Sequence, residues 1–476
     1  MIQLLSAYIA PIMFVCMVLL LLLGYPVAFS IAANGLLFGV IGIATGLLEP
    51  SIFQALPERV FGIMFNETLL AIPFFTFMGL ILERSGMAEE LLDTIGQLFG
   101  SVRGGLAYAV IFVGALLAAT TGVVAASVIS MGLISLPIML RYGYDTRLSA
   151  GVIAASGTLA QIIPPSLVLI VLADQLGRSV GDMYAGAMIP GLVLVALYMV
   201  FVLVMTLIKP QSAPALPPEA RTLRGGAMFT RVLTSLVPPL VLIFLVLGTI
   251  FIGLATPTEG GAMGAVGALA LALMRRRLSF DLLNQAMDKT AKLTCFAIFI
   301  LIGATVFGLV FRALDGDLWV EHLLINLPGG KIGFLLAVNA MVFVLAFFLD
   351  FFELAFIIVP LLAPVAHKLG IDLVWFGVLL AINMQTSFMH PPFGFSLFYL
   401  RSVAPKAVKT SDIYRGAIPF LIIQLLMVGL VIAVPELVSM NIDKVKEFDV
   451  NKIEIQVEGA KGGIGAPQGG SDGYPE

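Results

Sequence analysis

The chain has 476 residues, of which 60% are hydrophobic and 12% are charged, and its formal net charge is −3 at pH 7. The charged share is about half that of an average soluble domain, and a mean hydropathy of +1.06 excludes a water-soluble globular protein. The small net charge gives no indication of nucleic-acid binding. Cys16 and Cys295 both lie in apolar runs, so we expect inert packing residues rather than a redox pair.

Most of the chain consists of apolar segments long enough, or nearly so, to cross a hydrocarbon layer of about 30 Å as helices. We predict ten spans, at residues 5–23, 27–48, 66–83, 148–175, 187–208, 233–252, 259–274, 293–311, 373–399 and 417–434. Two further segments, 105–140 and 332–367, are predicted to be re-entrant hairpins that enter and leave on the same side. The predicted fold class is an all-α polytopic membrane protein.

The remaining segments connect or flank these spans. Residues 86–100 and 312–330 are amphipathic and are expected to lie along opposite membrane surfaces. Residues 209–232 contain four prolines and three arginines and are predicted to be a cytoplasmic linker between two halves, 1–208 and 233–434. The polar segment 435–476 is predicted to be a partly disordered tail, either a docking segment or a functionless extension.

The distribution of basic residues predicts the orientation. With the N-terminus outside, the cytoplasmic loops hold 17 of the 26 Lys and Arg residues, among them Arg275, Arg276 and Arg277. Cytoplasmic loops of membrane proteins carry such an excess. We therefore expect both termini to lie in the periplasm of a bacterial inner-membrane protein.

The two halves share a pattern at a constant offset of 227 residues. Residues 137–166 and 364–393 match at Pro137 and Pro364, Gly143 and Gly370, Asp145 and Asp372, and the pairs Pro164-Pro165 and Pro391-Pro392. Because the first half begins outside and has five spans, the second begins inside, and the repeats are predicted to be inverted. Prolines and glycines that merely kink helices are the alternative, but inverted repeats with broken helices are typical of secondary transporters.

Polar residues concentrate in four regions that this symmetry is expected to bring together. The candidates are Thr120, Thr121, Gly122 and Ser127 at the first hairpin tip, Ser156, Gly157 and Thr158 at the first helix break, Asp350 and Glu353 at the second tip, and Asn383, Thr386, Ser387 and His390 at the second break. Unwound carbonyls and hydroxyls are hard oxygen ligands that suit Na⁺, and half-helix N-termini suit a carboxylate substrate. These residues are therefore candidate sodium and substrate ligands.

Several candidates also have a purely structural interpretation. Ser and Thr in membrane helices often bond to their own helix, and His390 is either a proton or substrate contact or a hydrogen-bonded core imidazole. Asp350 and Glu353 indicate function because a carboxylate in the membrane is costly, although a location near the hairpin mouth is the alternative.

No Lys or Arg lies between Lys331 and Lys368 to pair with the second tip. We expect Asp350 to contact a cation from solution or a polar group near Thr386, and Glu353 to lie further from the tip.

The sequence contains no nucleotide-binding P-loop, no HExxH motif and no GxSxG motif. ATP is therefore not the predicted energy source, no cofactor is expected, and no enzyme activity is predicted. A channel would require a continuous polar stripe, whereas the polar residues here gather at four breaks.

At these motifs the sequence resembles the large membrane subunit of tripartite ATP-independent periplasmic (TRAP) transporters, over about residues 5–435. The stretches that carry the resemblance are GYPVAFSIA (24–32), LLAIPFFTFMGLILERSGMA (69–88), LLAATTGVVAASVISMGLISLPIMLRYGYD (116–145), AASGTLAQIIPPS (154–166), ATPTEGGAMGAVGAL (255–269) and HPPFGFSLFYLRSVAP (390–405).

The resemblance implies an elevator-type member of the ion-transporter superfamily, with a mobile domain built from the hairpins and broken helices. It further implies a small four-helix membrane subunit, a secreted periplasmic substrate-binding protein, an organic acid as substrate, and sodium symport. The alternative is a sodium- or proton-coupled carboxylate transporter of the same superfamily that acts without a binding protein.

The chain departs from the family's pattern at two places. Where members often read SGSSAAT, residues 121–127 read TGVVAAS, so Val123 and Val124 replace two serines and sodium there would need Thr121, Ser127 or backbone carbonyls. His390 replaces the usual Thr before the second Pro-Pro pair, which resembles the subgroup associated with 2-oxo acids, mannitol or chloroaromatic acids.

Overall fold

The computed structural model of the protein describes residues 2–121 and 124–442, with side chains from residue 8 onward except at 120 and 121. Every regular element in this part of the chain is helical, as the sequence predicts. The first half contains α1 (Ile2–Leu22), α2 (Val27–Ala44), α3 (Leu56–Met64), α4 (Ala71–Arg84), α5 (Met87–Leu98), α6 (Gly105–Thr121), α7 (Val124–Arg141), α8 (Thr146–Thr158), α9 (Leu167–Leu176) and α10 (Val180–Ile208).

The second half repeats this order of long helices, short surface helices, hairpin and broken helix. It contains α11 (Gly225–Phe251), α12 (Pro257–Met274), α13 (Phe280–Ala313), α14 (Gly316–Ile325), α15 (Gly330–Leu345), α16 (Phe351–Glu353), a π-helical turn (Leu354–Ile358), α17 (Val359–Lys368), α18 (Leu373–Ser387), α19 (Phe395–Val403), α20 (Thr410–Ala433) and α21 (Glu436–Ser439).

Seven helices within the described residues are long and apolar enough to cross a membrane unaided. Five coincide with predicted spans, namely α2, α10, α11, α13 and α20, whereas the other two are hairpin limbs, Val124–Arg141 and Phe351–Lys368. The other predicted spans are shorter, broken or less apolar, so helix length alone does not separate spans from hairpin limbs. The prediction of ten spans therefore stays a prediction.

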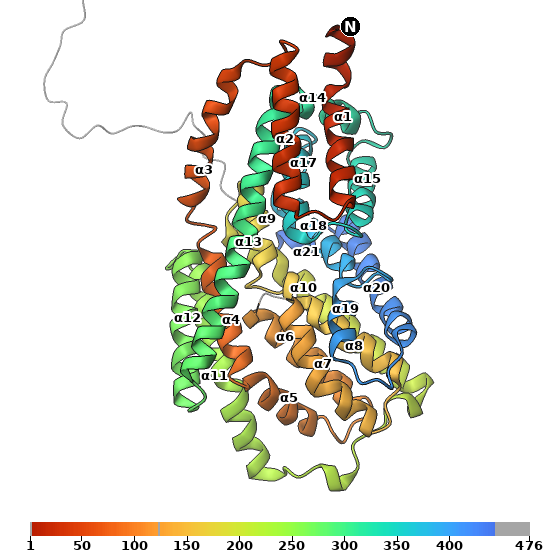
Figure 1. Ribbon diagram of the computed structural model, residues 1–476. Helices are drawn as coiled ribbons and strands as arrows, with labels where there is room; N and C mark the ends of the chain where they lie inside the picture. Colours follow the sequence, from red (N-terminus) through yellow and green to blue (C-terminus); the bar gives the residue numbers. More distant parts are fainter. Residues whose placement is uncertain (1, 122–123, 443–476) are drawn as a thin grey trace, which may run out of the picture. The chain divides into compact units, whose positions relative to one another are not determined.

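Two helix pairs connect the halves in a reciprocal way. α2 of the first half packs along α13 of the second, and α12 of the second half packs along α4 of the first (Figure 1). Small residues permit this close approach, because a Cβ added at Gly303 of α13 would lie 2.4 Å from the carbonyl oxygen of Ala28 in α2.

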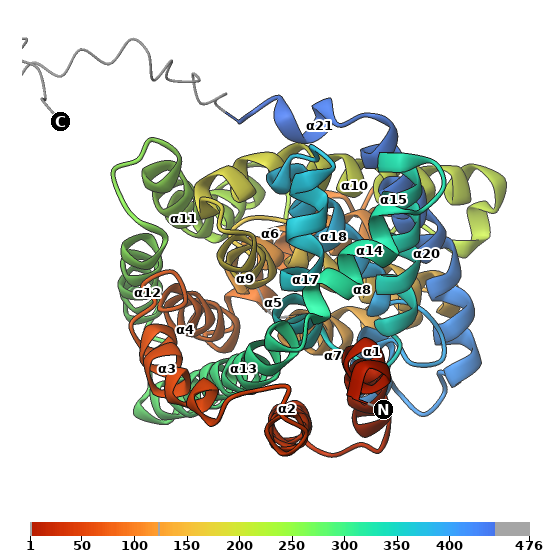
Figure 2. The ribbon, with the colours of Figure 1, turned by 90° about the horizontal axis from the view of Figure 1, so that it is seen from above.

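The broken helices lie between these pairs and α20. In Figure 2, α18 and α17 lie in the interior, with α11, α12 and α13 on one side and α20 on the other. α8 packs along α20, and α18 contacts α10, which again pairs an element of one half with an element of the other. A Cβ added at Gly151 of α8 would lie 2.1 Å from the carbonyl oxygen of Gly416 in α20.

Three helices differ in extent from the approximate spans and the linker predicted for them. The helix at the span predicted for 66–83 begins at Ala71, because the Asn66 side chain accepts the backbone N–H groups of Thr68 and Leu69 and holds a turn. α13 extends back to Phe280, where Ser279 caps it, thirteen residues before the predicted start of that span at 293. α11 begins at Gly225, so the last eight residues of the predicted linker, 209–232, are already helical.

Three backbone hydrogen bonds hold the linker against the base of the first hairpin. Leu216 N–H donates to the carbonyl of Gly100, Gly104 N–H donates to the carbonyl of Ala213, and Asp145 N–H donates to the carbonyl of Ser212. The predicted surface helix at 86–100 is present as α5, and Glu90 on α5 pairs with Arg231 and Arg275 at 3.3 and 2.8 Å. α5 therefore connects the hairpin base and linker to α11 and α12. Its predicted counterpart at 312–330 is present as α14.

Candidate functional site

Both hairpin tips and both helix breaks contribute to one cavity of about 260 Å³, together with α4 and α13. Val124 and Ala125 come from the first hairpin, Gln161 from the first break, Asp350 from the second tip, and Phe388 and Tyr399 flank the second break. Elements from both halves thus meet at one apolar cavity that contains a few polar groups, which is the usual composition of a small-molecule site.

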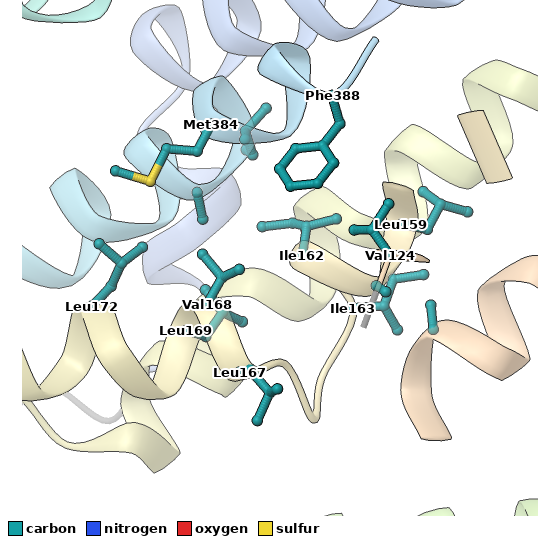
Figure 3. Packing of buried hydrophobic residues seen from close by; sticks show 14 of the residues in the cluster. Val124, Leu159, Ile162, Ile163, Leu167, Val168, Leu169, Leu172, Met384 and Phe388 are labelled. Carbon is teal, nitrogen blue, oxygen red and sulfur yellow. The ribbon is translucent and has the colours of Figure 1, made fainter. Parts of the chain in front are cut away.

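The first break follows a turn of 3-10 helix at the end of α8. Regular helix stops at Gln161, and α9 begins at Leu167 after the two prolines, with Ser166 as its N-cap. Ser166 Oγ also donates to the carbonyl of Gln161 at 2.6 Å, which satisfies a carbonyl that the break leaves free. Figure 3 shows that Phe388 of the second break and Val124 of the first hairpin gather beside Leu159 and Ile162.

The side-chain amide of Gln161 lies at the wall of this cavity. Within the described residues, neither its Oε1 nor its Nε2 has a hydrogen-bond partner, and the residue is 1% exposed. Thr76 of α4 likewise has a buried hydroxyl with no partner among these residues. Unpaired buried polar groups are costly unless a ligand or water binds them. Since both residues line the cavity, they are candidate substrate contacts that sequence reasoning missed, although both lie in the stretches that resemble the transporter family.

The second tip is a capping box made of the two predicted carboxylates. Glu353 N–H donates to Asp350 Oδ1 at 3.1 Å, and Asp350 N–H donates to Glu353 Oε2 at 2.9 Å. The second oxygen of each carboxylate takes no part in these bonds. The sequence placed Glu353 one helical turn further from the tip, but its carboxylate folds back to Asp350, because in a capping box the fourth residue's side chain accepts the N–H of the first.

The polar groups expected to contact Asp350 are engaged elsewhere, whereas the alternative, a cation from solution, stays a prediction. Thr386 and Ser387 donate instead to carbonyls one turn earlier in α18, those of Asn383 and Met384. Asn383 donates its amide to the carbonyl of Asn339 in α15, at 2.8 Å. These three candidates are therefore engaged within or beside their own helix, as membrane hydroxyls and amides often are.

His390 lies in an aromatic cluster rather than in the cavity. Its ring stacks on Phe347 with 3.7 Å between centroids and meets Phe343 edge to face. The ring is buried, and neither nitrogen has a hydrogen-bond partner in the described part of the chain. The hydrogen-bonded core imidazole considered from the sequence is thus not present.

Two candidates of the first half, Ser156 and Gly157, lie at close helix contacts. A Cβ at Gly114 of α6 would lie 2.6 Å from Ser156 Cβ, and a Cβ at Gly157 would lie 2.2 Å from Val128 in α7. α8 therefore fits between the limbs of the first hairpin, where Ser127 is buried. The side chains of Thr120 and Thr121, and all of Gly122 and Val123, lie outside the described residues. Among the predicted site residues that the structure describes, Asp350 is the one that lines the cavity.

A buried polar network joins the two breaks. Gln385 Nε2 and Gln424 Nε2 donate to Thr158 Oγ1 at 3.1 and 3.2 Å, and Gln424 Nε2 also lies 2.8 Å from the hydroxyl of Tyr198. Thr158 and Gln385 are separated by the repeat offset of 227 residues. The two breaks are therefore tied at equivalent positions. The offset alone could have indicated this pair, whereas nothing in the sequence indicated Gln424 or Tyr198.

Broken helices that meet at one cavity are typical of secondary membrane transporters. The chain belongs to the family described as "Tripartite ATP-independent periplasmic transporter, DctM component", whose sequence profile matches residues 14–437.

Relatives named as transporters support this assignment. The C4-dicarboxylate TRAP transporter large permease protein of Pseudomonas aeruginosa is 31% identical over 399 residues, which is 83% of this chain and 91% of that protein. The sialic acid large permease protein of Vibrio cholerae is 27% identical, over 88% of this chain and 94% of its own. The isethionate permease protein DctMQ of Oleidesulfovibrio alaskensis is 26% identical, over 89% of this chain and 65% of its own.

Solved structures share the fold. The YdaH transporter of Alcanivorax borkumensis superposes with a TM-score of 0.58 at 16% identity, over 82% of this chain and 90% of that one. MtrF of Neisseria gonorrhoeae gives a TM-score of 0.53 at 11% identity, over 81% and 83% of the two chains. At these identities the likeness is one of architecture.

Proposed function

We propose that the chain is the large membrane subunit of a sodium-driven importer for a small organic acid. A periplasmic binding protein delivers the acid, and a small four-helix membrane subunit completes the complex. Family membership supports this proposal. The related permeases are named for C4-dicarboxylates, sialic acid and isethionate, which are all anions at neutral pH. The shared chemistry of these substrates is a carboxylate or sulfonate group on a small polar body.

The proposal that sodium drives transport rests on the pair of carboxylates at the second hairpin tip. Asp350 faces the cavity, Glu353 is 6% exposed, and no Lys or Arg forms an ion pair with either among the described residues. Two carboxylates within membrane depth need compensating charge. A sodium ion that binds there would supply it, and its positive charge would also favour an anionic substrate in the same cavity.

We further propose that the two halves, 1–208 and 233–434, are inverted repeats that work as an elevator. Reciprocal packing of α2 with α13 and of α12 with α4 supports the repeat, as does the bond between Thr158 and Gln385. In this mechanism the hairpins and broken helices move as one body, and the Thr158 network holds the two breaks together during the movement.

Reconstitution of the chain with its two partner proteins tests the proposal. Proteoliposomes with an inward Na⁺ gradient should take up the binding protein's ligand, and an inward proton gradient of equal size without Na⁺ should not drive uptake. Undiminished uptake without Na⁺ would refute sodium coupling. Full-rate uptake of free substrate by the chain alone would refute the requirement for a binding protein and favour the binding-protein-independent alternative.

A further inference from the structure

A second cavity lies at the outer end of the seam between α13 and the second hairpin. It measures about 110 Å³ and is lined by Arg59 of α3, Gln175 of α9, Thr305 and Arg312 of α13, and Phe356 in the π-helical turn of the hairpin. In the predicted orientation this is the periplasmic end of the protein. No residue of this cavity lines the central one.

The charged side chains that line this cavity, those of Arg59 and Arg312, are both positive. Arg59 and Arg312 are exposed, neither side chain forms a hydrogen bond or an ion pair within the part of the chain that the structure describes, and no Asp or Glu lines the cavity. The neighbouring carboxylate, Asp174, is already bound by Asn66 Nδ2 at 2.6 Å and Gln175 Nε2 at 2.8 Å. Two guanidinium groups thus remain available, and guanidinium is the side-chain group best matched to carboxylate and sulfonate oxygens.

α13 and the second hairpin line both cavities. The central cavity uses Phe296 of α13 and Phe352 of the hairpin, whereas the outer cavity begins at Leu301 and uses Phe356. Five residues of helix separate Phe296 from Leu301, a rise of about 7.5 Å. The inner end of the outer cavity therefore lies about one and a half helical turns from the residues of the central cavity, and Arg312 lies at its outer end, eleven residues beyond Leu301.

The size of the outer cavity limits what it holds. At about 110 Å³ it is less than half as large as the central cavity of about 260 Å³, so it suits an anionic head group better than a whole substrate. We propose that this cavity is an anion-binding vestibule, which takes the carboxylate or sulfonate group of the substrate before the substrate reaches the central cavity. The identity of the anion rests on the proposed function, whereas the preference for negative charge rests on the two arginines alone.

Charged thiol reagents test the vestibule without knowledge of the substrate. In a full-length chain with Cys16 and Cys295 replaced by alanine, Gly308→Cys places a thiol on the cavity wall, where a Cβ meets no atom within 4 Å. The probes are the anionic reagent methanethiosulfonate ethylsulfonate and its trimethylammonium analogue. Focused positive potential should favour the anionic reagent by about tenfold at low salt, and 1 M salt should remove most of the preference.

Matched variants separate the vestibule from general surface charge. Arg59→Gln with Arg312→Gln should abolish the preference for the anionic reagent, and lysine at both positions should retain it. A thiol at Ser51, whose hydroxyl lies beside Glu49, should favour the cationic reagent instead. Equal rates for the two reagents at Gly308→Cys, or a preference that persists in the double glutamine variant, would overturn the proposal.

Uptake measurements show whether the vestibule proposal or the proposed transport function is wrong. In the reconstituted complex, the double glutamine variant should raise KM about tenfold and leave kcat unchanged, because an outer site accelerates capture and not translocation. Uptake with wild-type KM in that variant would overturn the vestibule while it leaves sodium-driven transport intact. Lack of any sodium dependence in the wild-type complex would refute the proposed function, and the reagent preference would then still decide the vestibule.

Discussion

Replacement of Asp350 by asparagine separates the two tasks that the structure gives this residue. Asp350 caps the hairpin turn through Oδ1, and it places negative charge at the wall of the central cavity. Asparagine caps a helix about as well as aspartate, whereas alanine at an N-cap costs about 1 kcal/mol. Asp350→Asn should therefore unfold at the wild-type temperature, and Asp350→Ala should be destabilised by about that amount.

The effect on sodium follows from the lost charge. A unit charge 4 Å from Na⁺ contributes about 1 kcal/mol in bulk water and about 4 kcal/mol at the effective dielectric constant of a protein surface. Since 1.4 kcal/mol corresponds to a factor of ten, Asp350→Asn should raise the half-saturating Na⁺ concentration between about fivefold and about a thousandfold. The upper part of that range would appear as abolished uptake.

Initial uptake rates against Na⁺ concentration in proteoliposomes give the required curve. Asp372→Asn is the matched control, because Asp372 also caps a helix, accepting the Trp375 N–H at 2.8 Å, but does not line the cavity. The control should keep wild-type Na⁺ dependence. If Asp350→Asn transports with the wild-type rate and Na⁺ dependence, the carboxylate acts only as a cap and the sodium site lies elsewhere.

Three further outcomes are expected. Alkaline phosphatase fused to the C-terminus should be active and a fusion at Arg276 inactive, and the reverse pattern would refute the predicted orientation. Gly303→Ala should lower the free energy of unfolding by about 1–3 kcal/mol because the new methyl group meets the Ala28 carbonyl, whereas Gly429→Ala, which meets nothing within 4 Å, should not, as thermal unfolding in detergent would show. Thr158→Val should remove the hydroxyl that accepts from two buried glutamine amides, and should lower the free energy of unfolding by about 1–3 kcal/mol. An unchanged unfolding temperature would contradict the network.

The polar residues of the central cavity were recognised from the sequence only in part. Asp350 stood out because a carboxylate in a long apolar stretch is expensive at any position in the membrane. Gln161 and Thr76 did not stand out, because a single amide or hydroxyl is common in membrane helices and often bonds locally. Only the fold shows that these two side chains line the same cavity and find no partner among the described residues.

Apolar length and consecutive prolines were enough to predict an all-helical membrane protein with two helix breaks, because both signals depend on local chemistry. The family was predicted separately, from the resemblance of several motifs to its members. Tertiary structure decided which polar groups meet. Thr158 and Gln385 lie 227 residues apart and hydrogen-bond only because α8 and α18 both pack against α20. Helices buried on all faces carry no amphipathic stripe, so their sequence does not reveal which side chain faces a partner and which faces the cavity.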